Sequence, residues 1–243
     1  KILVARRNPV ASPPDAGAPR HGPFPMSLHT DLNAALDAAV PEGVCVALED
    51  PQAEPLGLYP VEHQHVARAL DKRRREFAAG RRAARAALAC LGQGSVALPA
   101  RPSRAPVWPP GYVGSISHCA DLCLALAARK GALRSLGCDV ELRSPLSAPV
   151  VAAITSAAER DWLDAQSQFE PVHLFSAKEA VYKALFVLTG KVIGFHDLQI
   201  MPDSNGALVA HLTEAQPGFA RATALPLLSL SFPDHVIHMS FIH

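Results

Sequence analysis

Three short apolar segments follow one another in the middle of the chain without a helical segment between them. They span residues 113–117, 122–128 and 135–141. Their length and their content of Val, Ile, Leu and Ala are typical of β-strands. A doubly wound parallel sheet needs strands and helices in strict alternation, and this order lacks it. We therefore predict an α+β fold in which helices lie beside small antiparallel sheets.

The segments on either side extend this pattern. An earlier strand is predicted at 44–48, and a stretch rich in alanine and arginine at 61–91 is helical in composition, with Gly80 as a residue that could divide it into two helices. Residues 99–112 contain five prolines and predict an irregular loop. Towards the C-terminus the sequence predicts helices at 157–166 and 171–188, and strands at 208–212, 227–232 and 236–241.

Prolines also indicate how the chain is divided. Pro145 and Pro149 interrupt the pattern after the third central strand, so we expect an N-terminal subdomain at residues 26–144 and a C-terminal subdomain at residues 145–243. Residues 1–25 are rich in Pro, Ala and Arg. We expect them to be a flexible tail or a processing remnant that takes no part in the fold.

Charge and cysteine content argue against several classes of protein. The formal net charge is +1, so the overall charge does not indicate nucleic acid or a membrane surface as a partner. No apolar run reaches the roughly 18 residues of a membrane-spanning helix. The five cysteines form no CxxC pair, and we expect all of them to be reduced and structural, which favours the cytoplasm. They are Cys45, Cys90, Cys119, Cys123 and Cys138.

Two carboxylates stand two residues apart at the end of the third central strand. Residues at this spacing share one face of a strand, roughly 6.5–7 Å apart. Asp139 and Glu141 would then form half of a site for a hard cation such as Mg²⁺. From spacing alone, a solvated strand end is the better explanation.

A second charged cluster lies in the predicted helix 171–188. Glu179 and Lys183 share a face because they are four residues apart, and Lys178 stands beside them. A surface ion pair, or a capping box formed by Ser176 and Glu179, would explain these residues without a function. The neighbouring residues are mostly apolar, which favours charges kept at a pocket. The composition leaves both interpretations open.

Arginines dominate the predicted helix 61–91. Arg73, Phe77 and Arg81 follow one another at steps of four, and Arg85 extends the row. Guanidinium groups in such a row suit phosphate, which Arg binds with two parallel hydrogen bonds. A solvated helix face and a nucleic-acid surface are the alternatives. The near-neutral charge and the scarcity of aromatic residues count against the second.

Further phosphate donors follow in chain order. The segment GSISH at 114–118 can offer backbone N–H groups, the Ser115 hydroxyl and the His118 imidazole to an anion. Arg104, in the proline-rich loop, can add a guanidinium. A histidine near a strand end is more often a buried core residue, so this motif is weak by itself.

Taken in order, these motifs resemble one family, the surfactin-type (Sfp-type) 4′-phosphopantetheinyl transferases, and within it the enterobactin-synthetase-associated (EntD-like) branch. The resemblance rests on KRRREFAAGRRAARAAL, RAPVWPPGYVGSISHC, LGCDVE and FSAKEAVYKAL. The family pattern G-x-D-x-E is followed about forty residues later by S-x-K-E-A-x-x-K. Here Asp139 and Glu179 are forty residues apart. Cys138 and Phe175 depart from the branched apolar residue and the Trp that are usual there.

The resemblance implies the metal site and the catalytic residues. Asp139, Glu141 and Glu179 would bind Mg²⁺, with Mn²⁺ as a substitute, together with the pyrophosphate of coenzyme A. Glu179 is also the candidate base for the proton of the accepting serine, directly or through a water. Lys183 and His118 would offset the charge that develops during transfer, and both would also contact coenzyme A.

The remaining matches would bind coenzyme A. Arg73 and Arg81 match positions that hold the 3′-phosphate of the adenosine. Arg104 matches a further basic position near the nucleotide. Ser115 matches a residue at the pyrophosphate, and Lys178 matches a lysine near the phosphates.

The fold implied by the resemblance is a pseudo-twofold pair of similar α+β subdomains with the active site in the cleft between them. The activity implied is Mg²⁺-dependent transfer of 4′-phosphopantetheine from coenzyme A to a serine of an apo acyl or peptidyl carrier protein, with release of 3′,5′-adenosine bisphosphate. Carrier proteins of fatty-acid, polyketide or nonribosomal peptide synthesis are the expected partners. We expect a monomer that binds neither nucleic acid nor a membrane.

Two other functions would use the same residues. A metal-dependent phosphodiesterase or nucleotide hydrolase needs the same carboxylates and phosphate donors, with water as the nucleophile. A nucleic-acid-binding module would use the Arg73–Arg85 face, and its affinity would fall steeply with salt. The motif order favours the transferase over both.

Overall fold

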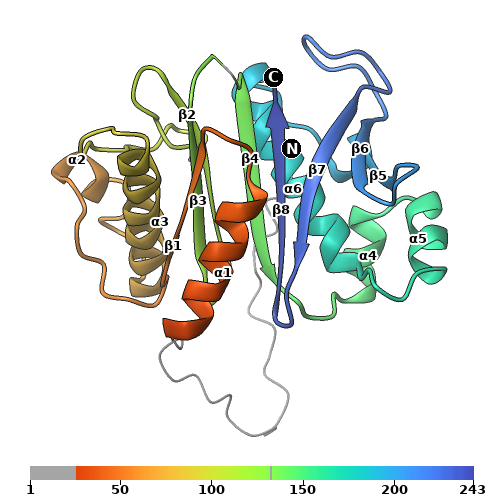
Figure 1. Cartoon of the computed structure of the whole chain (residues 1–243), viewed down its shortest axis with the longest axis horizontal. Coiled ribbons are helices and arrows are strands. Elements are labelled where there is room, and N and C mark those ends of the chain that lie inside the picture. The colour runs from red at the N-terminus through yellow and green to blue at the C-terminus, as the bar shows by residue number, and fades with distance from the viewer. Residues whose placement is uncertain (1–25, 132) are drawn as a thin grey trace, which may run out of the picture.

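Two sheets stand side by side, and helices cover their faces (Figure 1). The computed structural model describes residues 26–131 and 133–243, and for residues 26–31 the backbone alone. The segment 1–25, expected to be a tail or a remnant, lies outside the described residues. The first sheet has the strand order β1 (Val44–Glu49), β3 (Cys123–Arg129), β2 (Tyr112–His118). The second has the order β4 (Ser135–Leu142), β8 (His235–Ile242), β7 (Ala224–Ser231), β6 (Leu208–Leu212), β5 (Leu198–Pro202).

Every strand pair within the two sheets is antiparallel. This arrangement confirms the α+β prediction, since antiparallel neighbours can be joined by short turns and need no crossover helix. The predicted strands match β1, β2, β3, β4, β6, β7 and β8 to within a few residues. The strand β5 was not predicted, because LQIMP is short and ends in a proline.

The long helix α3 (Asp71–Cys90) packs on one face of the first sheet through small side chains. Ala83 and Ala87 are fully buried against Ala125 of β3 and its neighbours. Alanine faces bring a helix close to a sheet and lose no side-chain entropy when they are buried. The position of α3 relative to β2 is therefore closely defined.

The sequence suggested that the long helix divides at Gly80, but α3 is continuous through that residue. A Cβ at Gly80 would lie 3.0 Å from Cγ2 of Ile116 in β2, so this glycine serves close packing and not a break. The interruption lies earlier, in the turns that separate the short helix α2 (Pro60–His63) from α3.

A further helix, α1 (Met26–Ala39), covers the opposite face of the sheets (Figure 1). Leu32 and Leu36 of α1 belong to one buried cluster with Leu124 of β3, Val140 of β4 and Met239 of β8. This cluster spans both sheets and is the central core of the molecule. The sequence reading did not predict α1.

The second sheet carries α6 (Pro171–Thr189) on its other face, with α4 (Ala148–Ile154), α5 (Ala157–Asp164) and the 3-10 turn η1 (Phe195–Asp197) beside it. The predicted helices match α5 and α6, whereas α4 was not predicted. The helix α6 begins at a proline and ends at Gly190, whose φ of 62° is the left-handed conformation that terminates helices. Among the described residues, no helix combines the length and the apolar character that crossing a membrane requires.

Glycine at position 137 allows α6 to lie directly on β4. A Cβ there would collide with the carbonyl oxygen of Ala180 and lie 2.7 Å from the amide nitrogen of Ala184. The hydroxyl of Ser135 donates a hydrogen bond to the Ala184 carbonyl oxygen (2.6 Å). The backbone of α6 therefore rests on β4 with no side chain between them.

The two sheets meet at β2 and β4, which lie side by side but belong to different sheets. Serine hydroxyls of β2 bind the backbone of β4. The Ser115 hydroxyl accepts a hydrogen bond from the Cys138 amide (3.1 Å), and the Ser117 hydroxyl accepts one from the Val140 amide (3.4 Å). We call this contact between β2 and β4 the seam.

The expected division after residue 144 cuts through the second sheet. That division would leave β4 with the N-terminal half, but β4 pairs along its whole length with β8, from Ser135↔Ile242 to Leu142↔His235. Pro145 stands in the connection that leads out of β4, and Pro149 is the second residue of α4. They mark the end of a strand in the second sheet and not the boundary between the two sheets.

The expectation that all five cysteines are reduced is wrong for two of them. Cys45 of β1 and Cys90 at the end of α3 form a disulfide, with their Cα atoms 6.2 Å apart. They are 45 residues apart in sequence, and only the packing of α3 on β1 brings them together. Cys119, Cys123 and Cys138 are free and buried, as expected. The cysteines therefore no longer favour the cytoplasm.

Candidate functional site

A partly buried ion pair stands where α6 meets the seam. Lys183 of α6 places its ammonium 2.7 Å from Oδ1 of Asp139, 2.9 Å from the Ser117 hydroxyl and 3.0 Å from the Cys138 carbonyl oxygen. The Ser117 hydroxyl in turn donates to the same carboxylate oxygen, at 2.8 Å. Residues of β2, β4 and α6 thus converge on one point. Sequence reasoning missed Ser117 and selected its neighbour Ser115.

The carboxylates of Asp139 and Glu179 keep the Lys183 ammonium charged. Burial alone would lower the pKa of Lys183, but the negative charges of Asp139 and Glu179 outweigh burial and raise it. The ammonium therefore stays charged at any physiological pH. Burial raises the pKa of Glu179, the charge of Asp139 adds to this, and Lys183 opposes it. The three residues form one electrostatic unit.

Asp139 has an acceptor to spare. Its side chain is almost completely buried, and its second oxygen, Oδ2, accepts no hydrogen bond from the described residues. A buried carboxylate oxygen without a partner is costly unless a cation or a donor completes it. Glu141 stands on the same face of β4, two residues on, and is only partly covered. These residues fit a hard cation.

Asp139, Glu141 and Glu179 are not drawn tightly together. Within residues 26–131 and 133–243, the group of three potential ligands whose atoms all lie within 4.8 Å is a different one, Cys119, Asp121 and His235. This spacing is compatible with Mg²⁺, which is commonly held by one or two carboxylates together with substrate phosphates and waters. The three carboxylates remain a proposed metal site.

A second polar group lies at the end of β2. Nη1 of Arg73 lies 3.2 Å from Nε2 of His118, and the Glu76 carboxylate lies 3.5 Å from Arg73 and 3.7 Å from His118. Burial lowers the pKa of His118, Arg73 lowers it further, and Glu76 opposes both. Arg73 keeps almost half of its side chain exposed. Sequence reasoning did not identify Glu76.

The arginine row converges on an aromatic ring. The guanidinium carbons of Arg73 and Arg81 lie 5.9 Å and 4.0 Å from the centre of the Phe77 ring. Arg81 is 5% exposed and donates from Nε to the Leu98 carbonyl oxygen (2.6 Å), while its Nη2 has no hydrogen-bond partner in the described chain. Burial lowers the pKa of Arg81 to about 10, so it remains charged. The Nη2 atom is therefore a buried donor to which an anion could bind.

Three predicted site residues have other surroundings than expected. Lys178 is buried inside the C-terminal half, where its ammonium binds the Glu159 carboxylate (2.9 Å) and the carbonyl oxygens of Ile154 and Phe195. It joins α6 to α4, α5 and η1, and does not face the seam. Ser115 is buried and bound to β4. Arg104 lies exposed in the proline-rich loop.

The rest of the basic face is neutralised by acidic partners. Arg85, which was expected to extend the row, lies 2.8 Å from the buried carboxylate of Glu62. Its neighbours along α3 form three further ion pairs, Arg74–Asp71 (3.3 Å), Arg75–Glu54 (3.5 Å) and Arg82–Glu49 (3.0 Å). Of the six arginines between 73 and 85, Arg73 contacts His118 at the end of β2, and Arg81 lies on the Phe77 ring.

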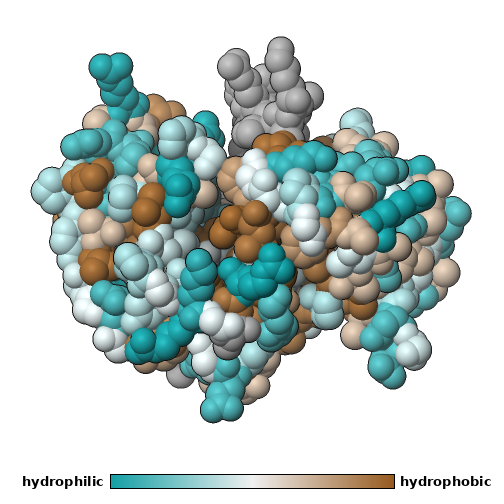
Figure 2. Space-filling model, turned by 90° about the horizontal axis from the view of Figure 1, so that it is seen from above, coloured by the Kyte–Doolittle hydropathy of each residue, from teal (hydrophilic) through white to brown (hydrophobic). Residues whose placement is uncertain are grey.

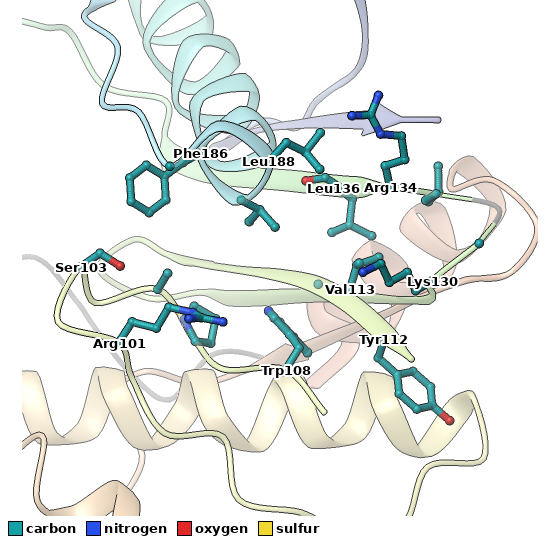
Figure 3. A pocket seen from close by; sticks show the side chains of 18 residues that line it. Arg101, Ser103, Trp108, Tyr112, Val113, Lys130, Arg134, Leu136, Phe186 and Leu188 are labelled. Atoms are coloured by element: carbon teal, nitrogen blue, oxygen red, sulfur yellow. The ribbon is translucent and has the colours of Figure 1, made fainter. Parts of the chain in front are cut away.

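A cavity of about 770 Å³ opens between the two halves at the starts of β2 and β4. Phe186 and Leu188, at the end of α6, line one side, and Arg101 and Trp108 of the proline-rich loop line the other (Figure 3). Seen from above, apolar surface gathers between the halves with hydrophilic residues on both sides (Figure 2). Ser135, which lines the cavity, shares a face of β4 with Asp139. The cavity and the Lys183–Asp139 ion pair therefore lie along one face of that strand.

Comparison with known proteins identifies the family. Residues 61–128 match the 4′-phosphopantetheinyl transferase N-terminal domain, and residues 135–236 match the 4′-phosphopantetheinyl transferase superfamily. The first match covers β2 and β3 of the first sheet but not β1, and the second begins at β4 and ends within β8. The sequence is 36% identical to the 4′-phosphopantetheinyl transferase Npt of Nocardia iowensis, over 80% of this chain and 91% of that protein.

Two other relatives agree. The sequence is 41% identical to the 4′-phosphopantetheinyl transferase Svp of Streptomyces mobaraensis, over 70% of this chain and 72% of that protein. It is 34% identical to enterobactin synthase component D of Salmonella typhimurium, over 69% of this chain and 70% of that protein. On these matches and this fold, the chain belongs to the 4′-phosphopantetheinyl transferase family.

Proposed function

We propose that this transferase moves 4′-phosphopantetheine from coenzyme A to a serine of apo acyl or peptidyl carrier proteins, that it depends on Mg²⁺, and that it releases 3′,5′-adenosine bisphosphate. The observation that carries the proposal is the Asp139 carboxylate. One of its oxygens is bound by Lys183 and Ser117, and the other is buried without a partner among the described residues. A site of this kind is completed by a cation and an anionic substrate.

The cavity and the Lys183–Asp139 ion pair together would hold coenzyme A. A volume of about 770 Å³ lies within the range of roughly 300–1,000 Å³ that is typical of small-molecule sites. Trp108 supplies an aromatic surface, and Lys130 and Arg134 supply positive charge around the cavity. The cavity lies at the starts of β2 and β4, away from Arg73 and His118 at the end of β2, so it suits the apolar arm of coenzyme A.

Phosphates would be bound at two points. Lys183, which is held charged by Asp139 and Glu179, would offset the charge that grows on the leaving phosphate. Arg73 and the free Nη2 of Arg81, which flank Phe77, would bind the 3′-phosphate. His118, beside Arg73, would donate a hydrogen bond between the two points.

The metal would be held by Asp139 through Oδ2, by Glu141 and by Glu179. When bound there, Mg²⁺ would neutralise negative charge on the pyrophosphate and make the phosphorus more electrophilic. Transfer of a phosphoryl-type group requires positioning and charge neutralisation more than covalent help from the protein. The fixed positions of Lys183 and Ser117 across the seam supply that positioning.

The serine proton needs an acceptor, and Glu179 is the proposed base. Burial raises its pKa, which makes its carboxylate more basic than an exposed one. The serine hydroxyl of the carrier would attack the β-phosphorus of coenzyme A while the proton passes to Glu179 or to a water beside it. The bond to the leaving 3′,5′-adenosine bisphosphate then breaks.

The test is a mass-spectrometric assay with the full chain, coenzyme A and a panel of apo carrier proteins. We expect the mass of phosphopantetheine to appear on one or more carriers in Mg²⁺ or Mn²⁺, and not after chelation. A carrier whose acceptor serine is replaced by alanine is the matched control. Consumption of coenzyme A without any carrier would identify a hydrolase and contradict the proposal.

The pairing of the basic face supports the transferase over a nucleic-acid-binding module. Most arginines of α3 already have acidic partners, so few positive charges remain for a phosphate backbone. A nucleic-acid surface would show affinity that depends steeply on salt and not on coenzyme A. Filter binding of a labelled duplex at two salt concentrations separates these cases.

A further inference from the structure

A second group of potential metal ligands lies at the opposite end of the seam from the cavity. Cys119 and Asp121 stand in the turn that joins β2 to β3, and His235 is the first residue of β8. Sγ of Cys119 lies 3.2 Å from Oδ1 of Asp121, and Nε2 of His235 lies 2.9 Å from the same oxygen. All three ligand atoms lie within 4.8 Å of one another.

The spacing of these atoms is close to that of a tetrahedral metal site. Around zinc, bond lengths of 2.0–2.3 Å place neighbouring ligand atoms about 3.3–3.8 Å apart. The two distances that involve Asp121 need to lengthen by less than about 1 Å to meet that geometry. A rotation of the Asp121 side chain, which is partly exposed, can provide this movement.

The chemistry of the donors selects the metal. A thiol, an imidazole and a carboxylate together favour Zn²⁺ and similar transition metals, whereas Mg²⁺ prefers oxygen ligands alone. The group is therefore chemically distinct from Asp139, Glu141 and Glu179. Cys119 and His235 are buried, while the Asp121 side chain keeps 19% of its surface exposed. Solvent can reach the site through Asp121, which also leaves room for a water as the fourth ligand.

The backbone holds the ligands in place. The amide of Cys119 donates to the Leu122 carbonyl oxygen (2.9 Å) and closes the turn. Gln52 donates to the Ala120 carbonyl oxygen (3.2 Å) and supports the same turn from outside. On the other side, the amide of Phe232 donates to the His235 carbonyl oxygen (2.8 Å) and closes the β7–β8 hairpin. Ligands on two closed turns lose little freedom when a metal binds.

We propose that Cys119, Asp121 and His235 form a binding site for a divalent transition metal of the zinc class, which joins the turn after β2 in the first sheet to β8 in the second. Such an ion closes the end of the seam opposite the cavity. Its ligand Cys119 directly follows His118 in the sequence. Metal binding releases the thiol proton of Cys119, and the oxidation state of the metal does not change. The role is structural, since the ion would join the β2–β3 turn of the first sheet to the start of β8 in the second.

The test is titration of the full chain with Co²⁺, which reports a thiolate ligand by a sulfur-to-metal charge-transfer absorption. It is done under inert gas with excess Mg²⁺ and without a reductant, so that the Cys45–Cys90 disulfide stays intact, and without coenzyme A or carrier protein. We expect one equivalent of Co²⁺ to produce the absorption and Zn²⁺ to abolish it by displacement. Absence of the absorption in the wild-type protein would overturn the proposal.

Four variants assign the site. Cys119→Ser should lose the absorption, and Asp121→Asn, which keeps the shape of the side chain, should weaken Co²⁺ binding by at least about tenfold. Cys123→Ser removes a buried free thiol four residues away and should keep the absorption. Asp139→Asn should also keep it, which separates this site from the proposed magnesium site. Loss of the absorption in Cys123→Ser together with its retention in Cys119→Ser would contradict the assignment.

A thermal measurement covers the case in which Cys119→Ser folds poorly. Micromolar Zn²⁺ should raise the melting temperature of the wild-type protein and of Cys123→Ser, because a ligand that binds only the folded state stabilises it. Asp121→Asn should show a smaller rise. Equal shifts in the wild-type protein and in Asp121→Asn would mean that zinc binds elsewhere.

Discussion

The carboxylate of Asp139 is bound on one side and open on the other, and this asymmetry defines the site at the scale of single residues. Oδ1 is saturated by Lys183 and Ser117, while Oδ2 is buried and has no partner within the described chain. The neighbouring carboxylates keep Lys183 charged, and burial raises the pKa of Glu179. Predictions about single residues follow from these contacts.

Glu179→Gln tests the proposed base and metal ligand. Because glutamine cannot accept the serine proton or carry the negative charge, we expect kcat to fall by about 10²-fold or more. Transfer is measured by mass spectrometry under single-carrier conditions. Glu54→Gln, at an exposed surface pair, is the control and should change kcat by less than about twofold. Near-wild-type turnover of Glu179→Gln would remove Glu179 from the mechanism.

Arg73→Ala tests the proposed 3′-phosphate site. We expect the affinity for coenzyme A to fall about tenfold or more, because a charge-assisted hydrogen bond is lost. The affinity for 3′-dephospho-coenzyme A should hardly change. Arg74→Ala, the next residue along α3, is the control because Arg74 binds Asp71 and the backbone of the preceding turn. Equal losses with both ligands, by calorimetry, would place Arg73 elsewhere.

Lys178→Met tests the structural role that the fold gives to this lysine. Glu159 would be left as a buried charge without its partner, so we expect the free energy of unfolding to fall by about 3 kcal/mol or more. The KM for coenzyme A should stay within about twofold in the folded fraction. Urea unfolding and steady-state kinetics provide the two readouts. An unchanged stability with a large rise in KM would support the original expectation of a phosphate contact.

At the scale of elements, the sequence predicted what periodicity and composition can show. Strands β1 to β4 and helices α5 and α6 are found near their expected bounds, because apolar runs of strand length and alanine-rich stretches are local signals. The helix α4 was missed because Pro149 was interpreted as a break. Proline at the first positions of a helix lacks only an N–H that would be unpaired there, and Pro149 occupies such a position.

Gly80 shows the converse error. Glycine within a helical stretch predicts a break, but here Ile116 of β2 packs against the helix at that point. Similarly, finding Ser117, whose hydroxyl binds Asp139, required the register of β2 against β4, which sequence does not contain. The motif residues could be predicted, whereas their partners across the seam could not.

Gly137→Ala tests the contact of α6 with β4. A methyl group would collide with the backbone of α6 at Ala180, and α6 must move away from the strand. We expect the free energy of unfolding to fall by about 1–3 kcal/mol and transfer activity to fall with it. Gly94→Ala is the matched control, because a Cβ there meets nothing within 4 Å and its backbone is not in the left-handed region. Wild-type stability of Gly137→Ala, by urea unfolding, would contradict this packing.

At the scale of the whole molecule, stability depends on a buried histidine. His238 of β8 is fully buried and both of its ring nitrogens are unpaired within the described chain. Burial lowers the pKa of His238 to about 3, and the nearby His173 contributes. The folded state therefore keeps this ring neutral at pH values at which the unfolded chain takes up a proton.

The pH dependence of unfolding tests this interpretation. Between about pH 6.5 and pH 3 the unfolded state binds one more proton at this position, so stability falls as the pH falls through that window. From pH 7.5 to 5.5, we expect the wild-type protein to lose about 1–1.5 kcal/mol more than His238→Leu, since other groups cancel in the comparison. Urea midpoints at both pH values measure the difference. Identical losses would show that His238 is protonated in the folded protein.

The seam between β2 and β4 has a consequence for how the chain reaches this structure. Each of these strands is the outer strand of its own sheet, and each would present a row of unpaired N–H and C=O groups if the other half were missing. Exposed outer strands recruit other chains and promote aggregation. We therefore expect each half, expressed alone, to self-associate. During synthesis, β2 would stay exposed as the outer strand of the first sheet until the second half has emerged. A chaperone that covers this strand would therefore raise the yield of active enzyme.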